Sequence, residues 1–129
     1  MIATSSPQTF FQMRVVTNTQ EKGDFNLYQD NNAPWALEGG DHVALRIGVA
    51  DETPPLVTIS SNAPSSDGSI AIIDRGVVNV TPALVTITLE PAGANKLPIG
   101  TLTGELRVIR GGAELHVCYG QVKVCRGSS

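Results

Sequence analysis

The chain has 129 residues, a length that fits one domain with a single hydrophobic core. Charged residues make up 16% of the chain and the formal net charge is −3, so there is no basic footprint for nucleic acid. The first residues lack the features of a signal peptide, and no apolar run approaches the roughly 18 residues of a membrane helix. We therefore expect a protein made in the cytoplasm that binds neither nucleic acid nor membranes.

Short segments with strand character follow one another along the first half of the chain. They are 9–16, 25–29, 43–49 and 56–60. The segment 43–49 is the clearest core strand, because its four aliphatic residues alternate on one face. The polar stretch 17–24 predicts a turn. The Ser-, Gly- and Pro-rich stretch 61–69 predicts a surface loop.

The second half continues the pattern with three more short strands, at 70–73, 77–80 and 85–89. Segment 91–97 is long enough for only one helical turn, and Pro98 ends it. In the last third of the chain, Leu102, Leu106 and Val108 alternate with polar residues. The Gly111-Gly112 pair suits a two-residue hairpin turn. Gly120 interrupts the last strand and predicts a β-bulge there.

The count of eight to ten short strands, with regular turn signals, predicts an all-β antiparallel sandwich or barrel. The expected organisation is an N-terminal tail (1–8), one sandwich domain (9–126) and a C-terminal tail (127–129). The Cys–Trp–Cys framework of antibody domains is absent, which disfavours a true antibody-type domain.

The sequence carries no strong catalytic or metal-binding pattern. His116 and Cys118 lie two apart on one predicted strand, where a thiolate–imidazole pair would also need an orienting acid and a cleft. Cys118 and Cys125 would lie about 23 Å apart on one extended strand, too far for a disulfide, so we expect reduced thiols. The alternative is a disulfide made possible by a sharp bend at Gly120. The Asp41-His42 pair is a weak metal motif. The chain is therefore expected to be non-enzymatic, with no cofactor and no metal.

The acidic residues near position 30 do not indicate a calcium-binding loop. Asp24, Asp30 and Asn32 lack the repeated spacing, and the Glu at the twelfth position, of a calcium-binding loop.

Four residues are candidates for an interface or binding site: Trp35, Tyr28, Tyr119 and His116. Trp35 follows Pro34 in a loop-like setting, where it could stack on a sugar ring or anchor a partner protein. The alternative for Trp35 is a structural side chain that packs against the core, as many tryptophans do.

Three stretches together resemble a known family: 25–49, 73–89 and 90–124. Their order of strands, the Asp-x-Gly-like corner Asp74-Arg75-Gly76, and the final Gly-x-Val-x-Val at 120–124 are similar to immunoglobulin-like β-sandwich proteins of tailed bacteriophages and prophages. The N-terminal domain of phage baseplate upper proteins is one example. The long loop 61–69 departs from that pattern.

This resemblance implies an immunoglobulin-like sandwich that serves as a virion component of the tail, baseplate or fibre. It would be assembled in the host cytoplasm and would contact other virion proteins and copies of itself, in a threefold or sixfold arrangement. The nearest alternative is a capsid-decoration or head-fibre protein. An alternative of another class is a carbohydrate- or protein-binding module that uses Trp35.

Overall fold

The computed structural model describes residues 10–28, 33–49 and 54–127, apart from the side chains of 10 and 116–118. The described residues form eight strands and one short helix. These elements are β1 (Phe10–Val16), β2 (Glu21–Asn26), β3 (His42–Gly48), β4 (Val57–Ser60), β5 (Gly68–Asp74), β6 (Leu84–Leu89), α1 (Pro91–Ala94), β7 (Gly100–Arg110) and β8 (Ala113–Cys125).

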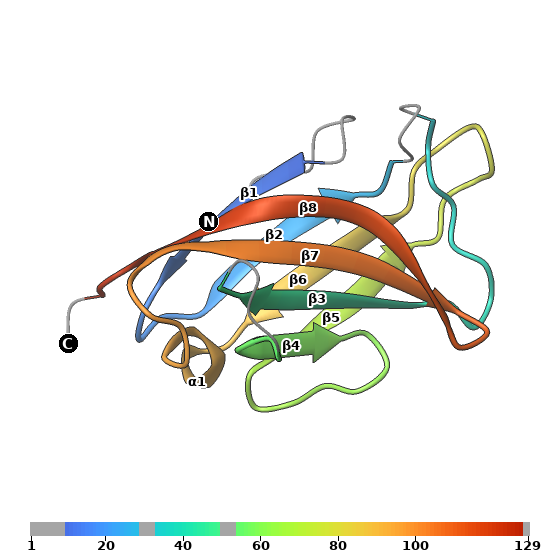
Figure 1. Ribbon diagram of the computed structural model, residues 1–129. Coiled ribbons are helices and arrows are strands. Elements are labelled where there is room, and N and C mark those ends of the chain that lie inside the picture. Colours follow the sequence, from blue (N-terminus) through green and yellow to red (C-terminus); the bar gives the residue numbers. More distant parts are fainter. Residues whose placement is uncertain (1–9, 29–32, 50–53, 128–129) are drawn as a thin grey trace.

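The strands form two layers, a five-stranded sheet and a three-stranded sheet (Figure 1). The first has the order β1-β8-β7-β3-β4 and the second the order β2-β6-β5. This is the immunoglobulin-like arrangement: in the lettering used for that fold, β2-β6-β5 correspond to strands B-E-D and β8-β7-β3-β4 to strands G-F-C-C′. All neighbouring strands are antiparallel except β1, which runs parallel to β8. The prediction of an immunoglobulin-like sandwich with one helical turn is confirmed.

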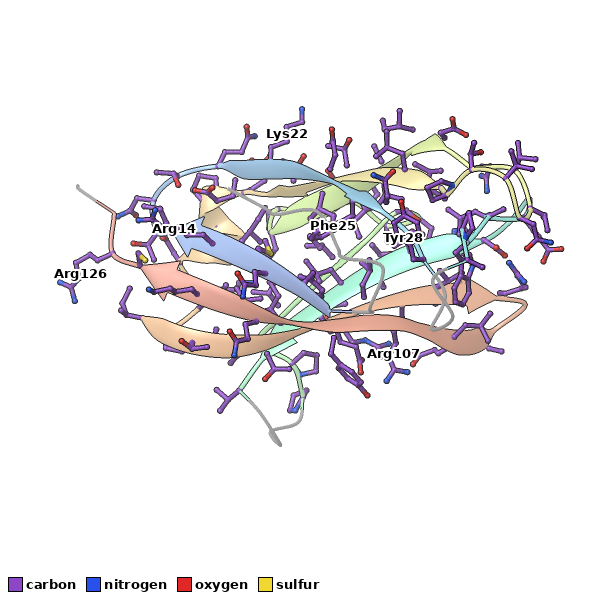
Figure 2. All side chains as sticks on the ribbon, turned by 90° about the horizontal axis from the view of Figure 1, so that it is seen from above. Arg14, Lys22, Phe25, Tyr28, Arg107 and Arg126 are labelled. Atoms are coloured by element: carbon purple, nitrogen blue, oxygen red, sulfur yellow. The ribbon has the colours of Figure 1, made fainter. Side chains whose placement is uncertain are left out.

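The core is a mostly aliphatic layer between the sheets, in which two phenylalanines, one from each sheet, contact each other. The Phe11 and Phe25 rings make an edge-to-face contact with centroids 5.2 Å apart, and Phe25 lies between the sheets in Figure 2. Phe11 comes from β1 and Phe25 from β2, so the pair links one sheet to the other. This contact occupies the interior of a sandwich that lacks the cysteine pair of antibody domains.

Two glycines make room for the Phe11 ring. Gly104 of β7 and Gly120 of β8 are cross-strand partners, and both are buried. A Cβ on Gly104 would lie 2.8 Å from Phe11 Cζ, and one on Gly120 would lie 2.5 Å from Phe11 Cδ1. The ring therefore occupies the space that two side chains would otherwise fill, which explains why glycine stands inside both strands.

The predicted bulge at Gly120 is wrong. Gly120 pairs in register with Gly104, and the register shift lies where Leu106 pairs with Cys118 and Arg107 with His116. Val117 is therefore the extra residue. The shift falls between His116 and Cys118, whose backbones pair with the neighbouring β7 residues Arg107 and Leu106. The bulge interrupts the regular alternation of β8 at this point. The side chains of His116 and Cys118 lie outside the described part of the structure, so the prediction that they share one face stays a prediction.

Three other boundaries differ from the sequence prediction. β2 begins at Glu21 inside the predicted turn, and β5 begins at Gly68 inside the predicted loop. The predicted strand 77–80 is a turn closed by a Val77–Thr81 bridge. β2 is the edge strand of its sheet, where charged residues can face solvent, so its first half reads as a turn.

Candidate binding surface

Three connections meet at one end of the sandwich, opposite α1 and the C-terminus (Figure 1). They are the β2–β3 segment 33–41, the β5–β6 segment 75–83 and the β7–β8 hairpin with its flanks, 110–115. We call these residues the loop end. In immunoglobulin domains, loops at one end of the sandwich form the binding surface of the variable domain.

Backbone hydrogen bonds hold the loop end together. The Trp35 N–H donates to the Leu27 carbonyl (3.0 Å), and the Trp35 carbonyl accepts from the Ala83 N–H (2.8 Å). The Leu37 N–H donates to the Arg75 carbonyl (2.7 Å). Segment 33–38 is therefore fastened both to the end of β2 and to the β5–β6 segment, which fixes Trp35 between them.

A pocket of about 360 Å³ opens at the loop end, a size within the range of small binding sites. Its lining is mostly apolar, with one acid and one base: Pro34, Trp35, Ala36, Glu38, Val78, Arg110 and Leu115. Trp35 is half-buried and also packs against the core. Trp35 thus has features of both predicted roles: it packs against the core as a structural side chain, and it lines a pocket as a binding residue would.

A buried carboxylate positions the charged side of the pocket. Asp41 is 3% exposed and accepts hydrogen bonds from Arg110 Nη2 (2.8 Å) and from the Glu38 N–H (2.8 Å). Hydrogen bonds from Arg110 hold the pKa of the Asp41 carboxyl below its usual range, against the effect of burial. Arg110 Nε also lies 2.8 Å from Glu38 Oε2. Asp41 is thus committed to an ion pair.

A turn closed by backbone hydrogen bonds and carrying three valines lies beside the pocket. Val77, Val78 and Val80 are 56%, 69% and 67% exposed. The Val77 N–H donates to the Thr81 carbonyl and the Val80 N–H to the Val77 carbonyl, at 3.0 and 2.9 Å. Asn79 adopts a left-handed conformation, with φ of 59°. Exposed apolar side chains on a well-ordered turn contribute little to the core, which is typical of contact surfaces.

Of the predicted residues whose side chains the structure describes, Trp35 lines this pocket, and Tyr28 and Tyr119 do not. Tyr28 is half-buried, and its backbone forms a β-bridge with Pro34, one of the residues that line the pocket. Tyr119 is 52% exposed and pairs with Glu105 in the middle of β7. The His116 backbone pairs with Arg107, and its side chain lies outside the described part of the structure.

The residues considered for metal binding or thiol chemistry either have structural roles or lie outside the described part of the structure. The Asp24 Oδ1 accepts a hydrogen bond from Thr86 Oγ1 (2.7 Å), whereas Asp30 and Asn32 are outside the described residues. Cys125 is a half-buried free thiol, and the Cys118 side chain is not described. Within the described ranges, no three His, Cys, Asp or Glu side chains are grouped so that they could hold a metal.

Sequence reasoning missed most of the pocket. The sequence predicts a strand at Val78 and a hairpin turn beside Arg110, and neither prediction points to a pocket. Both residues come from segments far from Trp35 in sequence, so only the topology brings them together. One available signal was Gly76 followed by Asn79, two residue types that favour left-handed turns.

No protein-family model and no curated protein matches the chain. In the part of the chain that the structure describes, no helix is both long and apolar enough to cross a bilayer.

Proposed function

We propose that the chain is a non-enzymatic structural subunit or adaptor of a tailed-bacteriophage virion, located in the tail, baseplate or fibre, that acts through protein–protein contacts. The resemblance to immunoglobulin-like phage proteins is the reason for proposing a virion location. The immunoglobulin-like strand order is compatible with it, although this fold serves many functions.

The observation that carries the protein–protein part of the proposal is the loop end. Three valines are exposed on a turn that backbone hydrogen bonds keep in one conformation. A preordered apolar surface loses little conformational entropy when a partner covers it. The pocket beside it, lined by Trp35 and Arg110, offers the kind of anchor site that is enriched at interfaces.

The proposal is tested with antibodies raised against the purified chain and applied to tailed particles from the source culture. We expect the chain to co-purify with intact particles and immunogold label to lie on the tail. Label on the head would favour the alternative of a decoration or head-fibre protein. Particles free of the chain, in a culture that produces it, would contradict the proposal.

A second candidate is a carbohydrate-binding module, favoured by the combination of Trp35, Glu38 and Arg110 in one pocket. An aromatic face with adjacent hydrogen-bonding groups suits a sugar ring. Trp35 is the only tryptophan, so its emission reports directly on this pocket. A saturable change in emission with a glycan, weakened in Glu38→Gln, would support this function. A flat response across a broad glycan set would remove it.

A further inference from the structure

We propose that the loop end is a twofold self-association surface, in which the Val77–Val80 turn of each copy enters the Trp35 pocket of the other. This inference rests on the proposed function only in taking the loop end as a protein-contact surface, and it names the partner as a second copy of the same chain.

The turn has the properties of a projecting anchor. Val77 and Val80 are more than half exposed, and neither belongs to the core. Gly76 holds the entry to the turn at φ of 79°, and a Cβ there would lie 2.6 Å from the Thr81 carbonyl oxygen. The Gly76 N–H also donates to Asp74 Oδ1 (2.8 Å). The valines are therefore presented by a backbone that is fixed before any partner arrives.

The pocket has room and chemistry for such an anchor. About 360 Å³ exceeds what one valine side chain requires, and five of its seven lining residues are apolar. Glu38 and Arg110 supply the remaining two, so polar groups lie beside an apolar lining. This combination of an apolar centre with polar neighbours is common at protein interfaces.

Anchor and pocket lie side by side on one surface, which is what a twofold interface requires. Val78 belongs to both, since it lines the pocket and neighbours the projecting valines in sequence. In an isologous pair, residue i of one copy contacts residue j of the other, and the reverse contact follows by symmetry. A surface that carries both complementary parts can therefore close on itself as a dimer.

Two residues of opposite charge directly precede the turn. Asp74 and Arg75 are both exposed, and Arg75 Nη1 donates to the Glu38 carbonyl (2.8 Å). Arg110 is already paired with Glu38 and Asp41 within the chain. In a twofold pair, Arg75 of one copy would face Asp74 of the other, and the reverse contact would follow by symmetry. This charge complementarity at the edge of the contact favours a second copy as the occupant.

The test combines sedimentation equilibrium with Trp35 emission over concentrations from about 1 μM to about 500 μM, a range that brackets micromolar dissociation constants. We expect a concentration-dependent dimer whose formation shifts Trp35 emission to shorter wavelength. Val80→Asp is expected to weaken the dimer at least tenfold, because a carboxylate would be buried in the pocket. Val80→Thr, which keeps the shape, is expected to weaken it less.

Ile99→Asp is the matched control, because Ile99 is 53% exposed and precedes β7 at the opposite end of the sandwich. It should leave the dimer unchanged, and thermal unfolding of each variant verifies the fold. A monomer across the whole range would overturn the inference. So would a dimer that Val80→Asp leaves intact or that forms without a change in Trp35 emission. If the chain is monomeric but is found on the virion tail, this inference fails while the proposed function stands.

Discussion

At the scale of single residues, the Phe11 ring packs closely over the Gly104–Gly120 pair of β7 and β8. Gly104→Ala should destabilise the fold by about 1 to 3 kcal/mol, the usual cost of overpacking a core, because its Cβ would lie 2.8 Å from Phe11 Cζ and 3.0 Å from Val122 Cγ2. Urea unfolding measures this loss.

Gly39→Ala is the matched control, because a Cβ there meets no atom within 4 Å. The penalty of Gly104→Ala should also shrink in a Phe11→Leu background, where the ring no longer fills the space above the glycine. Equal penalties in the two backgrounds would show that Phe11 is not what restricts position 104.

The ion pair between the buried Asp41 and the half-exposed Arg110 makes the stability of the loop end depend on pH. The lowered pKa of Asp41 means that its ion pair stabilises the folded state above the ordinary carboxyl pKa. This contribution is lost as pH falls through the lowered value. Asp41→Asn should cost about 1 to 3 kcal/mol near neutral pH, a typical range for a buried charged hydrogen bond.

The stability difference between the natural chain and Asp41→Asn should therefore narrow as pH drops below about 4, where free aspartate begins to protonate. Urea unfolding at several pH values follows this difference. A gap that stays constant down to strongly acidic pH would show that the carboxylate charge of Asp41 does not contribute.

At the scale of elements, alternating charges tie three strands together on the outer face of the five-stranded sheet. Arg46 of β3 and Arg107 of β7 both pair with Glu114 of β8, and Arg107 also pairs with Glu105. Figure 2 shows Arg107 on the side away from the other sheet. The pKa of Glu114 is lowered, chiefly by its hydrogen bonds from Arg46.

Because Glu114 is exposed, its pairs should add little stability and should be screened by salt. Glu114→Gln is expected to cause a small loss of thermal stability at low ionic strength. The loss should vanish at about 1 M NaCl, where the Debye length is about 3 Å. A salt-independent loss would indicate that position 114 matters through packing of the hairpin instead.

Elements with strong alternation could be predicted from the sequence, and those set by their neighbours could not. β3 and β6 bury one full face, so their aliphatic periodicity is clear. The valines at 77–80 imitate a strand, yet the left-handed Gly76 and Asn79 fold them into a turn. The bulge at Val117 depends on the register with β7, which no local pattern in β8 encodes.

At the scale of the whole molecule, the fold brings together three loops that the sequence keeps more than 25 residues apart. Trp35 was recognisable as a candidate because it is the only tryptophan and follows a proline. Its partners Val78, Arg110 and Leu115 could be identified only once strand order was known. The candidate surface is therefore a consequence of topology more than of any motif.

The central claim is that the loop end is the contact surface. The most direct test measures amide hydrogen exchange in the chain at low concentration and again in its assembled state. The account predicts that slowed exchange on assembly is concentrated in 33–38, 75–83 and 110–115. Slowing confined to the α1 end or to the outer face of β3, β7 and β8, with the loop end unchanged, would contradict it.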